Sequence, residues 1–248
     1  MELSIEIILF LFSVALVAGF IDTLAGGGGL ITIPSLLLCG VPPLQALGTN
    51  KFQSVIGTAT ATYILHKSKA INWQYMKLPL LYAFIGSALG TVVVQFIDKR
   101  ALSFVIPIVL IIIATYFLLS PLFPAENSKI ILSEKIYTKS ITPFIGAYDG
   151  MFGPGTGSFF ALAGVALRGK QLIDATIEAK PLNCATNFAS LIVFLFSGHI
   201  VWVLGFSMML GQFIGARLGA RMLFKINKNI LRYLIVCMCL GMLIKISL

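Results

Sequence analysis

The chain has 248 residues, of which 58% are hydrophobic and 11% charged, and its mean hydropathy is +0.98. A soluble domain has about 25% charged residues, and a soluble fold of this size could not hide so many apolar side chains from water. The net charge of +9 does not indicate nucleic-acid binding, because most cations lie in short gaps between apolar runs, as in cytoplasmic membrane loops. The composition therefore excludes a soluble enzyme, a disordered chain and a secreted disulfide scaffold, and it predicts a protein in a lipid bilayer.

The apolar runs predict membrane helices along most of the chain. They fall at 3–21, 28–40, 43–65, 76–97, 101–120, 138–150, 157–168, 171–196, 200–223 and 229–247. A crossing helix needs about 20 residues, so the runs 28–40, 138–150 and 157–168 predict broken or re-entrant helices. The first six residues carry two acids, Glu2 and Glu6, and no base, which is the reverse of a signal peptide. We therefore expect a membrane helix there, with its N-terminus outside.

An internal repeat divides the chain. Gly19–Asp22 matches Gly146–Asp149 at an offset of 127, and a glycine cluster follows each, at Gly26–Gly29 and Gly153–Gly157. Further along, the offset is 129, and the matching pairs are Ala46 with Ala175, Lys51 with Lys180, Ile71 with Ile200, Trp73 with Trp202, Gly86 with Gly215 and Gly90 with Gly219. We expect one all-α polytopic transmembrane domain made of two repeats of about five segments each, at 1–120 and 139–248, joined by a cytoplasmic linker at 121–138.

The lysine distribution predicts that the two repeats are inverted relative to each other. The gap 66–77 holds three lysines, whereas its repeat counterpart, 197–200, holds no Lys or Arg. Since Lys and Arg favour the cytoplasmic side, equivalent gaps lie on opposite sides of the membrane. Both termini are then outside, and the segments 66–77, 121–138, 168–170 and 221–229 are inside.

Polar side chains form one stripe on each of two apolar segments. At helical spacing, the first comprises Lys51, Ser54, Thr58 and Thr62, and the second comprises Lys180, Asn183, Asn187 and Ser190. A lysine near the bilayer centre costs about 2.5–3.5 kcal/mol, so it normally faces a partner or a wet cavity. The alternative is that both lysines snorkel to an interface. The coincidence of the stripes under the repeat favours a shared internal site.

Each glycine cluster follows an aspartate and opens a short helix. Asp22 and Asp149 are either caps of the following helix or carboxylates that pair with lysine or carry protons inside the membrane; the sequence supports both equally. Exposed backbone N–H groups at the start of a helix can bind an anion. By contrast, Gly86-x-x-x-Gly90 and the glycines at 211, 215 and 219 predict close helix packing.

Residues for catalysis or metal binding are not indicated. The only histidines, His66 and His199, lie at segment ends, and no hydrolase, metalloprotease or nucleotide-binding motif occurs. The four cysteines lie in apolar runs and read as packing residues. We expect no enzyme activity, no cofactor and no metal.

Two long motifs resemble the TauE/SafE sulfite-exporter family, most closely its YfcA-like branch. One runs from Asp22 to Pro34 and continues from Gly40 to Gln53; the other comprises Tyr148–Phe159 with Lys180, Asn183, Asn187 and Gly198–Trp202. The resemblance covers nearly the whole chain. It implies export of sulfite or organosulfur anions across the bacterial inner membrane.

These observations together predict a secondary transporter that exports a small anion, such as sulfite, an organosulfonate or a related carboxylate. The expected partners are this anion and the bilayer, without nucleic acid, and a homo-oligomer is compatible with the sequence. A passive anion channel is the first alternative, and an intramembrane enzyme or a scaffold subunit is the second. The candidate substrate-binding residues are Gly26, Gly27, Gly28, Gly29, Asn50, Lys51, Ser54, Thr58, Gly153, Gly155, Thr156, Gly157, Lys180, Asn183 and Asn187, with Asp22 and Asp149 as proton-coupling or structural residues.

Overall fold

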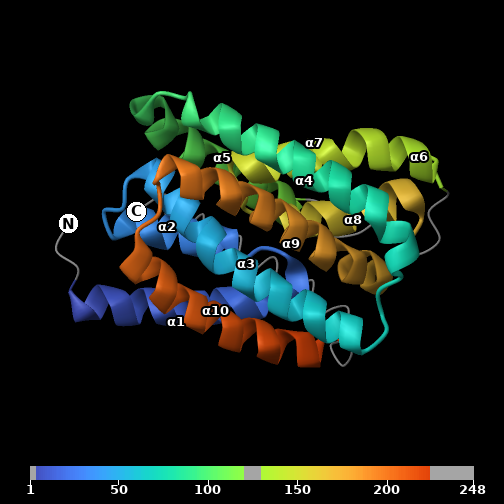
Figure 1. Cartoon of the computed structure of the whole chain (residues 1–248), viewed down its shortest axis with the longest axis horizontal. Coiled ribbons are helices and arrows are strands. Elements are labelled where there is room, and N and C mark those ends of the chain that lie inside the picture. Colours follow the sequence, from blue (N-terminus) through green and yellow to red (C-terminus); the bar gives the residue numbers. More distant parts are fainter. Residues whose placement is uncertain (1–3, 120–129, 224–248) are drawn as a thin grey trace.

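The computed structural model describes residues 4–119 and 130–223, which form helices without a β-strand (Figure 1). The elements are α1 (Ile5–Ala25), α2 (Gly29–Leu38), α3 (Pro43–Lys67), α4 (Trp73–Gln95), α5 (Lys99–Leu119), α6 (Glu134–Ile136), the π-helical turn η1 (Tyr137–Ile141), α7 (Thr142–Met151), α8 (Thr156–Arg168), α9 (Leu172–Ser197) and α10 (Trp202–Met222). The predicted segment 229–247 and residues 121–129 of the predicted linker lie outside the described residues.

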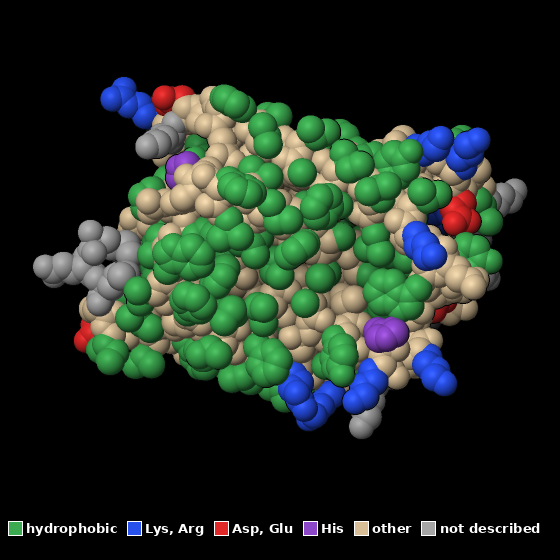
Figure 2. Space-filling view, in the orientation of Figure 1, with side chains coloured by type: hydrophobic (Ala, Val, Ile, Leu, Met, Phe, Trp, Pro, Cys, Tyr) green, Lys and Arg blue, Asp and Glu red, His purple; other side chains and the backbone are tan. Residues whose placement is uncertain are grey.

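Four of the described helices, α1, α4, α9 and α10, are long and apolar enough to cross a membrane. Hydrophobic side chains cover the middle of the molecule, while Lys and Arg side chains lie at its ends, most of them at the right (Figure 2). This distribution is expected of a protein whose middle contacts lipid and whose ends contact water. The chain is thus an all-helical, membrane-integral protein.

The predicted short segments differ in outcome. Helices α2 and α8 have 10 and 13 residues, which confirms that the runs 28–40 and 157–168 form short helices. The third predicted short run, 138–150, belongs to a longer helical stretch, because α6, η1 and α7 follow one another without a gap. The apolar pattern missed residues 134–137, where Glu134 and Lys135 are exposed and place their charges at the end of the molecule.

Helices from the two halves of the chain alternate in the bundle. The helix α1 packs along α10, α4 packs along α7, and α3 and α9 lie against each other and against α10 and α4, respectively. In Figure 1, α1 and α3 run from left to right, whereas α7 and α9 run from right to left; α4 and α10 also run in opposite directions.

Glycines allow two of these helix pairs to touch backbone to backbone. A methyl group on Gly86 of α4 would lie 2.2 Å from the Pro143 carbonyl oxygen of α7, and one on Gly215 of α10 would lie 2.0 Å from the Leu16 carbonyl oxygen of α1. Gly90 and Gly219 make similar approaches one turn later. The prediction that these glycines serve close helix packing is confirmed.

The described parts of the chain segments predicted to lie inside gather at one end of the bundle. The ends of α3, α8 and α10 and the starts of α4, α6 and α9 all lie at the right of Figure 1.

Gly169 and Gly198, with φ of 63° and 71°, end α8 and α9 in the left-handed conformation, which glycine adopts without steric cost.

Candidate functional site

The two glycine-rich helix breaks meet in the interior. A Cβ atom on Gly26, where φ is +83°, would lie 2.4 Å from the carbonyl carbon of Gly157. The backbone N–H of Ser158 donates to the Gly26 carbonyl at 3.4 Å, and the Ser158 hydroxyl donates to the Ala25 carbonyl. The breaks therefore satisfy part of each other's backbone hydrogen-bonding capacity, and only glycine fits at their crossing.

The remaining cluster glycines line the same region. A Cβ on Gly29 would lie 3.2 Å from Pro154 Cα, and the Gly27 carbonyl accepts from Leu30 N–H at 3.0 Å. Gly155 precedes α8 with φ of +78°, and a Cβ on Gly153 would lie 3.1 Å from Lys51 Nζ. The second cluster thus borders the first buried lysine.

Lys51 of α3 and Asp149 of α7 form an ion pair at this crossing. Lys51 Nζ lies 2.7 Å from Asp149 Oδ2, and each side chain is 1% exposed. The other carboxylate oxygen, Oδ1, accepts a hydrogen bond from the Thr156 hydroxyl at 2.6 Å. Of the two roles considered for this aspartate, the structure places Asp149 in the lysine-paired one.

Lys180 of α9 and Asp22 of α1 lie together in a different arrangement. Lys180 Nζ donates to the backbone carbonyl of Asp22 at 2.6 Å, and Asp22 Oδ1 accepts from the N–H of Gly28 at 2.9 Å. The side chain of Asp22 thus serves the start of α2. Among the residues that the structure describes, no carboxylate forms an ion pair with Lys180. Both lysines are 1% exposed and bonded internally, so the snorkelling interpretation is wrong.

Apart from the half-buried Thr62, the other residues of the polar stripes are buried, as are Asn50 and Gln53 beside them. Asn50 Oδ1 accepts from the Thr32 hydroxyl at 2.6 Å and from Gln53 Nε2 at 2.9 Å, and Gln53 also reaches Ser54 Oγ at 3.3 Å. Asn187 Nδ2 donates to the carbonyl and the side chain of Asn183, and the Thr58 hydroxyl donates to the Ser54 carbonyl. The stripes therefore form two polar seams within the bundle.

Several buried polar residues were not predicted from the sequence. Among them are Thr32, Gln53, Ser158 and Gln212, all 2% exposed or less. The two glutamines interrupt apolar runs, and the cost that singled out the lysines could have found them. Because Leu182 and Ala83 occupy their repeat counterparts, the comparison of the halves did not draw attention to them.

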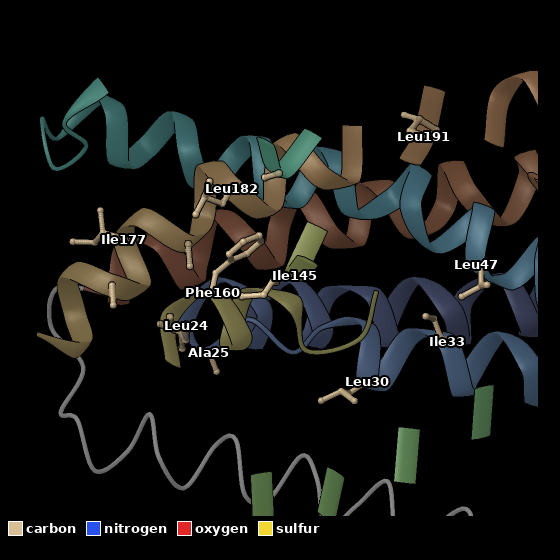
Figure 3. Close-up of a cluster of buried hydrophobic side chains, with 14 of the residues drawn as sticks. Leu24, Ala25, Leu30, Ile33, Leu47, Ile145, Phe160, Ile177, Leu182 and Leu191 are labelled. Atoms are coloured by element: carbon tan, nitrogen blue, oxygen red, sulfur yellow. The ribbon is translucent and has the colours of Figure 1, made fainter. Parts of the chain in front are cut away.

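A cavity of about 370 Å³ opens at the basic end of the bundle, between α4, η1, α8 and α9. Arg168 lies at its rim, where it donates to the Leu132 carbonyl at 2.8 Å and pairs with Glu134 at 3.7 Å. Phe160 and Ala175 are among its lining residues. Phe160 follows Ser158 of the crossing by two residues, and it belongs to the same buried apolar cluster as Ile145 and Ala25 (Figure 3). The inner wall of the cavity is therefore close to the crossing of the breaks.

An all-helical membrane protein with charged and amide side chains buried at broken helices has the features of a membrane transporter. The family model "Sulfite exporter TauE/SafE" matches residues 11–246, and the chain belongs to this family of membrane transporters.

Curated relatives extend over nearly the same length. A "Probable membrane transporter protein" of Haemophilus influenzae is 43% identical over 99% of this chain and 96% of its own length. One of Sinorhizobium is 39% identical over 99% and 94%, and YfcA of Escherichia coli, also named a probable membrane transporter protein, is 41% identical over 91% and 84%. These names indicate transport and not catalysis. No solved structure matches the chain.

Proposed function

We propose that this protein is a secondary transporter that exports a small anion, such as sulfite, an organosulfonate or a related carboxylate, across the bacterial inner membrane. The observation that carries the proposal is Lys180, a buried ammonium group bonded to a backbone carbonyl and not to a carboxylate. A buried charge is stabilised by a counter-ion, and a bound anion would supply it.

The proposed site lies where the two helix breaks cross. Lys180 provides the first charge, and Lys51 provides a second when the anion replaces Asp149 as its partner. The amides of Asn183 and Asn187 and the backbone N–H groups of the glycine clusters are neutral donors for the remaining oxygen atoms. Asp149, released from Lys51, is the group that could take up a proton and so couple the anion to proton movement.

We propose that the halves 1–120 and 139–248 are inverted repeats, with α2 and α8 as re-entrant helices. Corresponding helices run in opposite directions in Figure 1. The contacts of Gly86 with Pro143 and of Gly215 with Leu16 also correspond to each other through the two sequence offsets. The basic end is then cytoplasmic and both termini periplasmic.

The membrane potential suits this direction of transport. With the cell interior negative, moving one negative charge outward releases about 2.3 kcal/mol per 100 mV, so export requires no nucleotide hydrolysis. A passive channel would use the same site. Saturable flux without a continuous ionic current favours a transporter over a channel.

The test combines binding and flux. Purified protein is heated with sulfite, a small sulfonate or a small carboxylate, since a ligand of the native state raises the melting temperature; the anion giving a shift is then followed in proteoliposomes. We expect Lys180→Ala to abolish both the shift and the flux, whereas Lys77→Ala, which removes an exposed lysine, leaves both intact. The proposal is wrong if a folded Lys180→Ala protein binds and transports the anion as the parent does.

A further inference from the structure

The two buried lysine–aspartate pairs occupy corresponding positions in the two halves. Lys51 and Lys180 match at the offset of 129, and Asp22 and Asp149 match at 127. Each lysine reaches the aspartate of the opposite half: Lys51 contacts Asp149, and Lys180 contacts Asp22. A rigid two-fold arrangement would make the two contacts alike.

The contacts are instead of two kinds. In one, the carboxylate of Asp149 binds the lysine ammonium group directly. In the other, the carboxylate of Asp22 binds the N–H of Gly28, and the lysine binds the main-chain carbonyl of the aspartate. Gly155 is the repeat counterpart of Gly28. Its backbone N–H is therefore the group that corresponds, for Asp149, to the Gly28 N–H that Asp22 binds.

The packing around corresponding residues near the two ends of the molecule also differs. Ala175 is 2% exposed, and it lines the inner part of the cavity at the basic end. Its counterpart Ala46, near the opposite end, is 0% exposed in a cluster with Leu36, Leu204 and Met208. The two kinds of lysine–aspartate contact therefore coincide with a cavity beside Ala175 and with close packing at the corresponding place beside Ala46.

We propose that the two lysine–aspartate pairs exchange their arrangements during transport and thereby act as the switch between the two access states. In the second state, Lys180 forms the ion pair with Asp22, while Asp149 accepts from the Gly155 N–H and Lys51 donates to the Asp149 carbonyl. The cavity closes around Ala175 and opens around Ala46. This inference rests on the proposed inverted-repeat transporter.

The exchange conserves the number of buried interactions. Each state contains one buried ion pair, one carboxylate bound to a backbone N–H and one lysine bound to a carbonyl. States that hold the same set of interactions differ little in free energy, and a ligand that favours one of them can then shift the population. An anion bound at Lys180 competes with Asp22 for the ammonium group and so delays the switch until the anion leaves.

The test uses two matched cysteine reporters and two aspartate variants. In the full-length protein with Cys39, Cys184, Cys237 and Cys239 replaced by serine, Ala175→Cys and Ala46→Cys are made separately, and each is labelled in detergent with a water-soluble thiol reagent. Asp22→Asn keeps an oxygen for the Gly28 N–H but cannot form the second-state ion pair. Asp149→Asn removes the ion pair of the present state.

The two variants should act in opposite directions. We expect Asp22→Asn to keep Ala175→Cys reactive and to slow labelling of Ala46→Cys, and Asp149→Asn to slow Ala175→Cys and speed Ala46→Cys. Each change should be at least about tenfold, because losing one partner of a buried ion pair typically shifts an equilibrium by more than that. Thr156→Val removes the hydroxyl that binds Asp149 and should give a smaller change in the same direction as Asp149→Asn. It replaces Asp149→Asn in the test if the Asp149→Asn protein does not fold.

Labelling needs no substrate, so the result does not depend on which anion is transported. Opposite responses of the reporters support the switch even if no tested anion moves. If both aspartate variants change a reporter in the same direction, or neither changes it, the exchange is wrong, whereas the transport proposal stands or falls on the flux of Lys180→Ala.

Discussion

Lys51 illustrates why a buried charge must be judged together with its partner. The side chain is 1% exposed, and its ammonium group is 2.7 Å from Asp149. Placing two charges in a low-dielectric interior costs several kcal/mol per ion, which their attraction only partly returns. Apolar residues would pack there at least as well, so the retention of the pair points to function and not to stability.

This argument predicts the outcome of single and paired substitutions. Lys51→Met leaves Asp149 as an unpaired buried carboxylate and should destabilise the protein by about 3–5 kcal/mol, seen as a lower melting temperature in detergent. Adding Asp149→Leu should recover most of that loss, because neither charge remains. Anion flux should be lost in both proteins. A double variant that is less stable than Lys51→Met alone would contradict this account.

Part of the site was predictable from residue types alone. The insertion cost of a central lysine and the matching stripes identified Lys51 and Lys180 as internal residues. The partner of each lysine was not predictable, because Lys51 of α3 and Asp149 of α7 belong to opposite halves and meet only in the folded bundle. A helical pattern fixes which residues share a face of one helix, but not which helices become neighbours.

At the scale of the helices, backbone contact replaces side-chain packing. Lipid offers apolar side chains as good an environment as another helix does, so membrane helices gain more from close approach. Gly86 places α4 directly against the Pro143 carbonyl of α7. The neighbouring Leu89 of α4 is 61% exposed and, on the lipid-facing side, contributes little to this interface.

Two substitutions on α4 therefore should differ in effect. Gly86→Ala inserts a methyl carbon that would lie 2.2 Å from the Pro143 carbonyl oxygen, and such overpacking costs about 1–3 kcal/mol. We expect a melting temperature several degrees below that of the parent. Leu89→Ala removes more atoms but no interhelical contact, so the melting temperature should stay close to the parent's. Equal losses for the two variants would show that Gly86 is not at a tight interface.

Sequence patterns located the helices better than their ends. Described helices overlap the apolar runs, since a long apolar stretch has few alternatives in lipid. The early start of the second half at Glu134 was missed, because its polar first turns resemble a linker. The short lengths of α2 and α8 were predicted, because the apolar runs 28–40 and 157–168 are too short to cross a membrane.

The whole molecule is polarised along its long axis. Most Lys and Arg side chains visible in Figure 2 lie at the end where α3 and α8 finish and α4 and α9 begin. Lys67, Lys69 and Lys77 surround the turn between α3 and α4, whereas the turn between α9 and α10 holds His199 and no lysine. This asymmetry gives the molecule a preferred orientation.

Reporters inserted in these two turns test the orientation. A tag between 68 and 72 should be cytoplasmic, and one between 198 and 201 should be periplasmic, as judged by enzyme fusions that are active on only one side of the membrane. A third fusion at the C-terminus, outside the described residues, should be periplasmic by the sequence prediction. If the first two tags report the same side, the proposed topology is wrong.

The pairing of α1 with α10 has a consequence for how the protein is made. Among the described helices, α1 is synthesised first, whereas Gly211, Gly215 and Gly219, against which its backbone packs, lie on the last one. At 5–20 residues per second, α1 waits roughly 10–40 s in the membrane before its partner is synthesised. During that time, the side of α1 that later packs against α10 contacts lipid or the insertion machinery. The seam between α1 and α10 can therefore close only after α10 has been synthesised.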